Sequence, residues 1–165
     1  MIKKEMQDAI NKQIVREIYS ANLYLAMASY YATMNLNGFS NWMRVQADEE
    51  MQHAMKFFDY LLDRNGKPVI GAIDAPQTEW KSTLDAFESA LEHEKKVTGY
   101  INDLMDLSIE LKDHATTSLL QWFIDEQVEE EVTTGEMVDR LKLIDDSKGA
   151  LFFLDNELKS RTKTQ

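Results

Sequence analysis

The sequence predicts a single all-α domain, built as a four-helix bundle with a short fifth helix at its C-terminal end. Helix-favouring residues dominate the chain, with apolar residues spaced three and four apart, and the two prolines, Pro68 and Pro76, both lie in one short segment. The length of 165 residues fits one domain and is enough to bury a sizeable core. We therefore expect residues 1–165 to form one domain, with the bundle over about residues 4–143.

Composition narrows the functions that such a bundle can serve. The formal net charge of -11 disfavours nucleic acid and anionic membranes as partners, because both would repel the protein, and favours cations. The chain contains no cysteine, which excludes disulfides, thiolate metal sites and iron–sulfur clusters. The first residues lack the apolar run of a signal peptide, and no stretch approaches the roughly 20 apolar residues of a membrane helix. We expect a cytoplasmic protein.

The first two helices are predicted over about residues 4–34 and 40–64, the second ending at Asn65-Gly66. The inward stripe of the first helix consists of Ile10, Ile14, Glu17, Ile18, Ala21, Leu25 and Ala28. The stripe of the second consists of Phe39, Trp42, Met43, Gln46, Glu50, His53, Phe57, Tyr60 and Leu61. Ionisable residues therefore occupy positions that should face the core.

The segment over residues 65–78 lacks a helical pattern and is longer than the usual connection between neighbouring helices of a bundle. Fully extended at about 3.3 Å per residue, it reaches roughly 46 Å, the length of a long helix. It is therefore predicted to cross the bundle from end to end, so that the helices before and after it run parallel.

The second half of the chain repeats the pattern of the first. A third helix is predicted over about residues 80–110, with a stripe of Leu84, Phe87, Leu91, Glu94, Val97, Ile101 and Met105. A fourth is predicted over about 112–143, with Thr116, Leu120, Phe123, Gln127, Glu130, Thr134, Met137 and Leu141. A fifth, over about 146–160, is apolar on more than one side through Leu151, Phe152, Phe153, Leu154 and Leu158. The polar residues 160–165 are expected to fray.

The polar residues on these stripes follow a regular spacing. Glu50 and His53 form a Glu-x-x-His pair one helical turn apart, so both side chains can reach one ion. The interval from Glu17 to Glu50 equals the interval from Glu94 to Gln127. Two antiparallel hairpins would bring these groups to one level of the bundle. A buried carboxylate costs several kcal/mol unless it is paired or bound to metal.

The charges of this set fit two divalent ions. Four carboxylates supply four negative charges, which two Fe(II) ions would neutralise: Glu17, Glu50, Glu94 and Glu130. Carboxylate and imidazole ligands without thiolate also suit iron. The alternative is a set of separate buried ion pairs, which is disfavoured because no Lys or Arg lies on the same stripes between the candidates.

Over nearly its whole length the sequence resembles the prokaryotic non-haem ferritins. The segments that carry the resemblance are REIYSA (16–21), LYL (23–25), FSNWM (39–43), EEMQHA (49–54), EHE (92–94) and QVEEE (127–131). It implies a ferritin-like bundle with a long crossover, in which Glu17 and His53 bind a first iron, Glu94 and Glu130 a second, and Glu50 bridges them. Gln127 would contact the site without charge.

The resemblance also implies a function. Such ferritins are ferroxidases that oxidise Fe(II) with dioxygen or hydrogen peroxide and store the Fe(III) as a mineral inside a 24-subunit shell. A third iron would lie near Glu49, Glu126 and Glu129 with Glu130; the first three are each one residue from a proposed ligand, and otherwise form a solvated acidic face. Tyr24 would lie near the iron centre, or is an ordinary core aromatic.

Several other interpretations remain in competition. A storage or structural helical shell without ferroxidase activity is one, and the inward polar residues argue against it. A haem-containing bacterioferritin is another, but Gln52 stands between Met51 and Met55, and Gln127-x-x-Glu130 replaces a second Glu-x-x-His. No haem is expected, and the methionines are interpreted as core residues. The fifth helix disfavours a DNA-protecting mini-ferritin. The lone histidines His93 and His114 are given no role.

Overall fold

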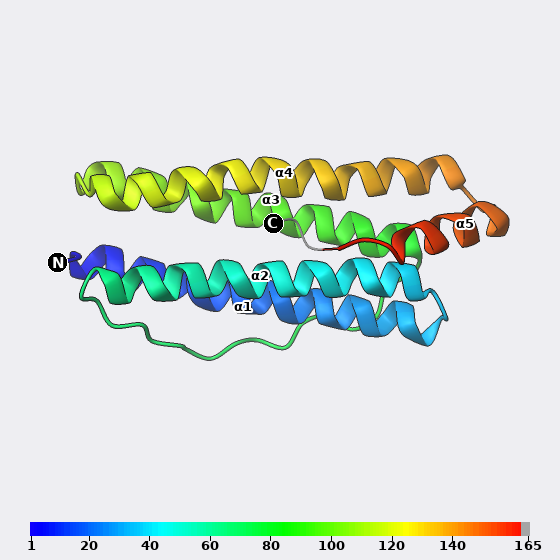
Figure 1. Cartoon of the computed structure of the whole chain (residues 1–165), viewed down its shortest axis with the longest axis horizontal. Helices are drawn as coiled ribbons and strands as arrows, with labels where there is room; N and C mark the ends of the chain where they lie inside the picture. Colours follow the sequence, from blue (N-terminus) through cyan, green and yellow to red (C-terminus); the bar gives the residue numbers. More distant parts are fainter. Residues whose placement is uncertain (163–165) are drawn as a thin grey trace.

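The computed structural model describes residues 1–162, in which every regular element is a helix. The helices are α1 (Lys4–Thr33), α2 (Asn37–Asp63), α3 (Thr83–Glu110), α4 (His114–Ile144) and α5 (Lys148–Leu158). α1 packs mainly against α2 and α3 mainly against α4, and the two pairs form a bundle with α5 at one end (Figure 1). The predicted all-α, five-helix fold is confirmed. None of the helices in this part of the chain is both long and apolar enough to span a membrane.

Caps and left-handed residues set the helix boundaries. The backbone at Asn35, Asn65, Lys112 and Asp145 has φ between 50° and 60°, which ends or interrupts the helical path there. The sequence predicted that the fourth helix would begin near Lys112, but the positive φ of this residue excludes it from the helix, and α4 begins at His114. Likewise α3 begins at Thr83 rather than near residue 80, because the Ser82 side chain accepts a hydrogen bond from the amide of Asp85.

The helix α2 begins at Asn37, three residues before the predicted start, and Gly38 lies inside it. A Cβ at Gly38 would lie 1.6 Å from the backbone oxygen of Asp155, so only glycine permits this close approach of α5. The buried Asp155 carboxylate accepts hydrogen bonds from the amides of Gly38 (2.7 Å) and Phe39 (3.1 Å). These bonds satisfy amides at the start of α2 and fix α5 there.

The segment between α2 and α3 runs along the α1–α2 pair, as Figure 1 shows. Asn11 holds it at two points, donating to the carbonyl of Lys67 (3.0 Å) and accepting from the amide of Val69 (2.8 Å). The side chain of Gln7 also accepts from the amide of Lys67. As predicted, α2 and α3 therefore run in the same direction along the bundle.

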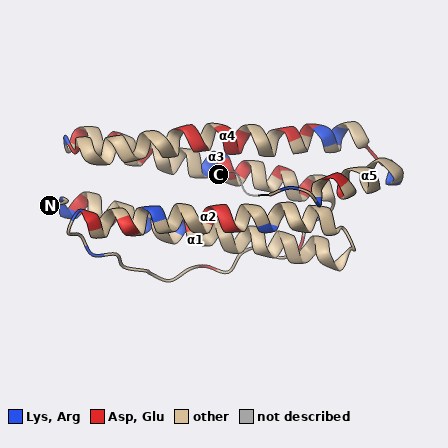
Figure 2. Ribbon diagram, viewed as in Figure 1, with Lys and Arg blue, Asp and Glu red and all other residues tan. Residues whose placement is uncertain are grey.

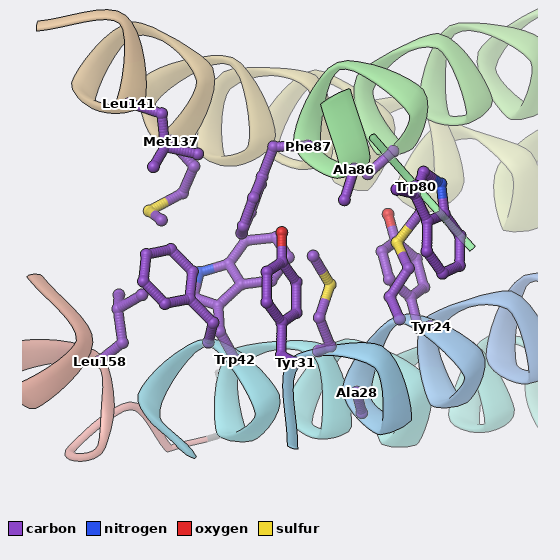
Figure 3. Close-up of a cluster of buried hydrophobic side chains, with 14 of the residues drawn as sticks. Tyr24, Ala28, Tyr31, Trp42, Trp80, Ala86, Phe87, Met137, Leu141 and Leu158 are labelled. Carbon is purple, nitrogen blue, oxygen red and sulfur yellow. The ribbon is translucent and has the colours of Figure 1, made fainter. Parts of the chain in front are cut away.

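Two clusters of buried apolar side chains fill the bundle, one on each side of a polar layer. The first contains Tyr31, Trp42 and Phe87, which lie together in Figure 3. The second, toward the other end, includes Phe57 and Phe123, whose rings stack at 3.9 Å. Leu25 belongs to neither: it is 52% exposed, so its predicted place on the inward stripe is wrong. Tyr24, one residue earlier, takes the inward position and turns Leu25 outward.

Candidate metal centre

The layer between the two apolar clusters is polar, and each long helix contributes to it. α1 supplies Glu17, α2 supplies Glu50 and His53, α3 supplies Glu94, and α4 supplies Gln127 and Glu130, all of them buried. Acidic segments colour the middle of α2 and of α4 in Figure 2. The structure therefore brings every residue proposed for the iron pair to one level of the bundle, as the equal intervals in the two halves of the sequence suggested.

On the α1–α2 side, Glu17, Glu50 and His53 offer ligand atoms that all lie within 4.8 Å of one another. His53 Nδ1 lies 3.5 Å from Glu50 Oε2, and Gln13 Nε2 donates to Glu17 Oε1 at 2.7 Å. The remaining oxygens, Glu17 Oε2 and Glu50 Oε1, are buried and have no hydrogen-bond partner. Unpartnered carboxylate oxygens are costly in a core, and a bound cation would satisfy both.

On the α3–α4 side, protein donors already hold the carboxylates. The Tyr24 hydroxyl donates to Glu94 Oε1, and Gln127 Nε2 donates to Glu94 Oε2 at 3.2 Å. Gln46 Nε2 donates to Glu130 Oε2 at 2.7 Å. Glu94 and Glu130 are therefore oriented before any ion arrives, each by a neutral group that adds no competing charge.

Burial and the charges of neighbouring acids favour the protonated form of Glu50, Glu94 and Glu130 in the metal-free protein. Burial raises the pKa of Glu50 well above its ordinary value, and the charges of Glu94 and Glu17 raise it further. Burial likewise raises the pKa of Glu94 to about 7, despite the opposing hydrogen bonds from Tyr24 and Gln127. Burial and the charge of Glu94 raise the pKa of Glu130 to about 7. Cations that bind here must displace protons.

A groove of about 580 Å³ opens beside the layer, between α2 and α4. It is lined by all four residues proposed for a third iron: Glu130, which is shared with the pair, and Glu49, Glu126 and Glu129. Glu126 lies nearest the pair: its Oε2 is 3.8 Å from His53 Nε2, and one oxygen each from Glu126 and Glu130 lies within 4.8 Å of the same histidine. Glu129 lines the groove as an exposed residue, and Glu49 lines it in contact with Arg161. The three therefore share one groove but differ in depth.

Contrary to the prediction that residues 160–165 fray, the beginning of this segment is bound to the bundle. Arg161 lies against this groove and donates to the Trp42 carbonyl at 2.9 Å, and its Nη2 is 3.3 Å from Glu49 Oε2. The inward stripes carry no cation between the candidate ligands, but Arg161 brings one to the edge of the layer from outside the bundle. Residues 163–165 of the predicted frayed end lie outside the described residues.

Sequence reasoning gave no role to Gln13, Gln46 and Arg161, although all three contact the site. The two glutamines carried a usable signal, because each lies four residues before a predicted ligand and so on the same helical face. Arg161 carried none, since its position depends on how α5 docks. Of the two histidines that were given no role, His93 forms a hydrogen bond with Ser20 at 2.7 Å, and His114 is exposed at the start of α4.

This donor set, held inside four long helices, defines a helical-bundle metal protein of the carboxylate class. The ferritin family profile, described as a ferritin-like domain, matches residues 7–144. Bacterial non-heme ferritins of Bacteroides fragilis and Staphylococcus saprophyticus are 40% and 41% identical to the chain, each over 98% of it and over 100% and 97% of their own lengths. The chain belongs to the ferritin family and is an iron-storage ferritin.

Solved structures agree with this assignment. An engineered closed form of the Archaeoglobus fulgidus ferritin superposes with a TM-score of 0.98 at 49% identity, covering 99% of this chain and all of that one. The open-pore ferritin from the same archaeon superposes with a TM-score of 0.97, again at 49% identity, covering 98% of this chain and all of its own. The likeness therefore includes the crossover and α5 as well as the bundle.

Proposed function

We propose that this ferritin is a ferroxidase, which oxidises Fe(II) at a two-iron centre inside each chain before the Fe(III) is stored. The observation that carries the proposal is the pair of buried, unpartnered oxygens on Glu17 and Glu50, next to His53. Storage alone needs no such site, because an acidic inner surface can collect ferric ions. A costly buried cluster of acids is better explained by a reaction that depends on it.

In the proposed centre, Glu17 and His53 bind one Fe(II), Glu94 and Glu130 bind the other, and Glu50 bridges the two. The short distances among Glu17, Glu50 and His53 support the first half of this assignment. The effects of Glu94 and Glu130 on the pKa of Glu50, and of Glu94 on the pKa of Glu130, support the second, because they require these groups to be near one another. Gln127 contacts Glu94 and adds no charge.

The proposed reaction takes one electron from each of two ferrous ions. With dioxygen it is 2 Fe(II) + O₂ + 2 H⁺ → 2 Fe(III) + H₂O₂, and hydrogen peroxide can itself serve as the oxidant for a further pair. Holding both ions in one site delivers two electrons together and avoids releasing superoxide. The protein's contribution is to fix the ions with carboxylates whose protons leave on binding, in a layer that apolar clusters enclose on both sides.

We further propose a third iron position in the groove, bound by Glu126, Glu129 and Glu49 with Glu130 shared. The closeness of Glu126 and Glu130 to His53 supports a cation near the mouth of the pair. An ion there could supply a further electron and lies on a route out of the centre. A solvated acidic wall is the competing interpretation, and a variant described in the Discussion separates the two.

The proposed assembly is a shell of twenty-four chains of 19.1 kDa, about 460 kDa in all. Phe152 and Phe153 of α5 are 66% and 72% exposed on this chain, and large side chains so placed are typical of an interface between subunits. Light scattering at moderate salt should find this mass, and a strictly monomeric protein under all ionic conditions would rule out the shell. A single domain over residues 1–165, a cytoplasmic location and the expectation of no haem stay predictions from the sequence.

The ferroxidase itself is tested by anaerobic loading of the metal-free protein with Fe(II), followed by rapid mixing with oxygenated buffer. The fast oxidation phase, followed by absorbance, should grow with added iron and saturate at two Fe(II) per chain. A variant that lacks an exposed acid, Glu92→Gln, should behave identically. Oxidation no faster than that of Fe(II) in buffer, with an intact shell, would leave a storage protein without ferroxidase activity.

A further inference from the structure

The chain following α5 brings one arginine back to the acidic groove. The side chain of Arg161 is only 18% exposed, and its guanidinium lies 4.2 Å from the ring centre of Trp42. Its Nη1 donates to the Trp42 carbonyl at 2.9 Å, and its Nη2 donates to the side-chain oxygen of Gln46 and to Glu49 Oε2 at 3.3 Å. Three acceptors and an aromatic face therefore hold the group in one place.

The backbone around Arg161 is fixed as well. Asn41 Nδ2 donates to the carbonyls of Leu158 (3.1 Å) and Arg161 (3.0 Å), and so binds the end of α5 and the residues beyond it to α2. The buried Asp155, also in α5, caps the start of the same helix. Because α2 carries Glu49 and Glu50 as well, the docking of α5 determines where the guanidinium lies relative to the groove.

Arg161 also determines how Gln46 faces the iron pair. A guanidinium only donates hydrogen bonds, so the group of Gln46 that faces Arg161 must be its oxygen. The amide nitrogen then points the other way, where Gln46 Nε2 donates to Glu130 Oε2 at 2.7 Å. One arginine thus contacts Glu49 directly and orients Glu130 through a single intervening side chain.

We propose that Arg161 is an intrinsic cation of the groove, which pairs with Glu49 and orients Gln46 in the metal-free chain and competes with an incoming metal ion for the groove carboxylates. The proposal deepens the third iron position proposed above and rests on it for its biological meaning. Among the described residues, the other cation that lines the groove is Lys56, whose Nζ lies 3.7 Å from the ring centre of Trp122, so these two cations contact different aromatic rings.

The consequence is a groove that binds a third metal ion less tightly than its carboxylates would allow. An ion that approaches Glu49 meets a fixed positive charge and must displace or repel it. Weak binding suits a position through which ions pass, because an ion held too tightly would block the exit from the pair. Arg161 is in this sense a positioning residue for Glu130 and a determinant of affinity in the groove.

The test measures the affinity of the metal-free assembled protein for Tb³⁺, a redox-inert hard cation whose luminescence is sensitised by nearby tryptophan such as Trp122. Arg161→Gln should bind Tb³⁺ at least about tenfold more tightly than the wild type. Arg161→Lys should show a smaller gain, because the charge remains but the fork of donors is lost. The matched control is Arg140→Gln, which removes an arginine paired with Glu157 of α5 on the surface and should leave the affinity unchanged.

Tb³⁺ can also enter the iron pair, so the same comparison is repeated in a Glu49→Gln background. There the gain from Arg161→Gln should fall to less than about twofold, since the two residues are expected to act on each other. An unchanged affinity in Arg161→Gln, or an equal gain without Glu49, would overturn the proposal. Unchanged affinity with a lower melting temperature would also overturn it and leave Arg161 as an anchor for α5. No iron oxidation enters the measurement, so its failure is distinguishable from failure of the ferroxidase proposal.

Discussion

The two helix hairpins offer matched positions to the centre, but the protein prepares them differently. The same shift along the sequence relates the members of each pair: Glu17 and Glu94, Glu50 and Gln127, His53 and Glu130. In the α1–α2 hairpin two carboxylate oxygens are buried without partners. In the α3–α4 hairpin, donors from Tyr24, Gln127 and Gln46 satisfy the corresponding acids.

This difference teaches where metal binding should relieve the largest penalty. An unpartnered buried carboxylate has a high free energy, so a cation gains most by binding where no donor already stabilises the oxygens. The α1–α2 hairpin also holds the only histidine among the proposed pair ligands, and a neutral imidazole is a good ligand for Fe(II). We therefore expect the first Fe(II) to bind at Glu17, Glu50 and His53, and the second to bind near Glu94 and Glu130.

The largest effect on the oxidation rate is expected from Glu50→Ala, because this change removes a ligand that both proposed iron ions share. Fast oxidation at two Fe(II) per chain should slow by on the order of 100-fold or more, while the shell stays intact. The melting temperature of the metal-free variant should not fall, because one of several repelling buried acids is gone. Glu92→Ala is the control, and a wild-type rate in Glu50→Ala would remove this residue from the centre.

A more selective effect is expected from Tyr24→Phe, which removes the phenol that donates to Glu94. That hydrogen bond lowers the pKa of Glu94, so its loss should raise this pKa further and weaken the second ion by about tenfold near pH 6.5. The first ion should bind as before, which calorimetry with a redox-inert divalent ion can measure. Tyr31→Phe, which loses a bond to the Thr83 carbonyl far from the acids, serves as the control; equal losses at both ions would contradict the comparison.

The pH dependence of the metal-free protein reports on the same acids. The pKa values of Glu94 and Glu130 rise from an ordinary 4.5 to about 7 in the fold, so the folded chain keeps protons that the unfolded chain has released. This contribution to stability is complete below pH 4.5 and is lost as the pH rises through 7. The melting temperature should fall by about 3 to 6 °C between pH 6.5 and 8. A Glu94→Gln variant that keeps the full pH dependence would refute this explanation.

The smallest change in initial rate is expected when Glu49, Glu126 and Glu129 are all replaced by Gln. These residues line the groove rather than the buried layer, so oxidation of the first two ions should stay fast. The number of Fe(II) consumed per dioxygen should fall toward two, because no third ion supplies a further electron. Oxygen-electrode titration measures the ratio. An unchanged ratio would mean that the trio is only an acidic wall, and Glu130 is left intact because both sites share it.

The fold followed from the sequence because its signals were local and repeated. Helical spacing located all four long helices, and the length of the segment around Pro68 and Pro76 indicated that α2 and α3 run parallel. The boundaries were less certain, since Lys112 and Asp145 have positive φ angles, which are uncommon for residues other than glycine. Gly38 lay outside the predicted second helix, but the structure places it inside α2, where the close approach of Asp155 from near the other end of the chain requires a glycine. No local pattern carries that information.

As with the fold, only part of the candidate site could be predicted from the sequence. The ligands Glu50 and His53 could be predicted because a polar residue on an apolar stripe requires a partner, and the repeated interval between the hairpin positions added Glu94 and Gln127. Which oxygens have donors could not be predicted, because that depends on side-chain positions across the bundle. Arg161 shows the limit most clearly: nothing in its polar surroundings indicates a buried contact, and only the docking of α5 creates one.

Anomalous diffraction from crystals loaded anaerobically with Fe(II) tests the central claim most directly. At one Fe(II) per chain, the account predicts a stronger iron peak beside Glu17, Glu50 and His53 than beside Glu94 and Glu130. At saturation it predicts two peaks on either side of Glu50. Equal peaks at low loading, or a stronger peak at the α3–α4 hairpin, would contradict the difference between the hairpins, and no peak in the layer would contradict the centre itself.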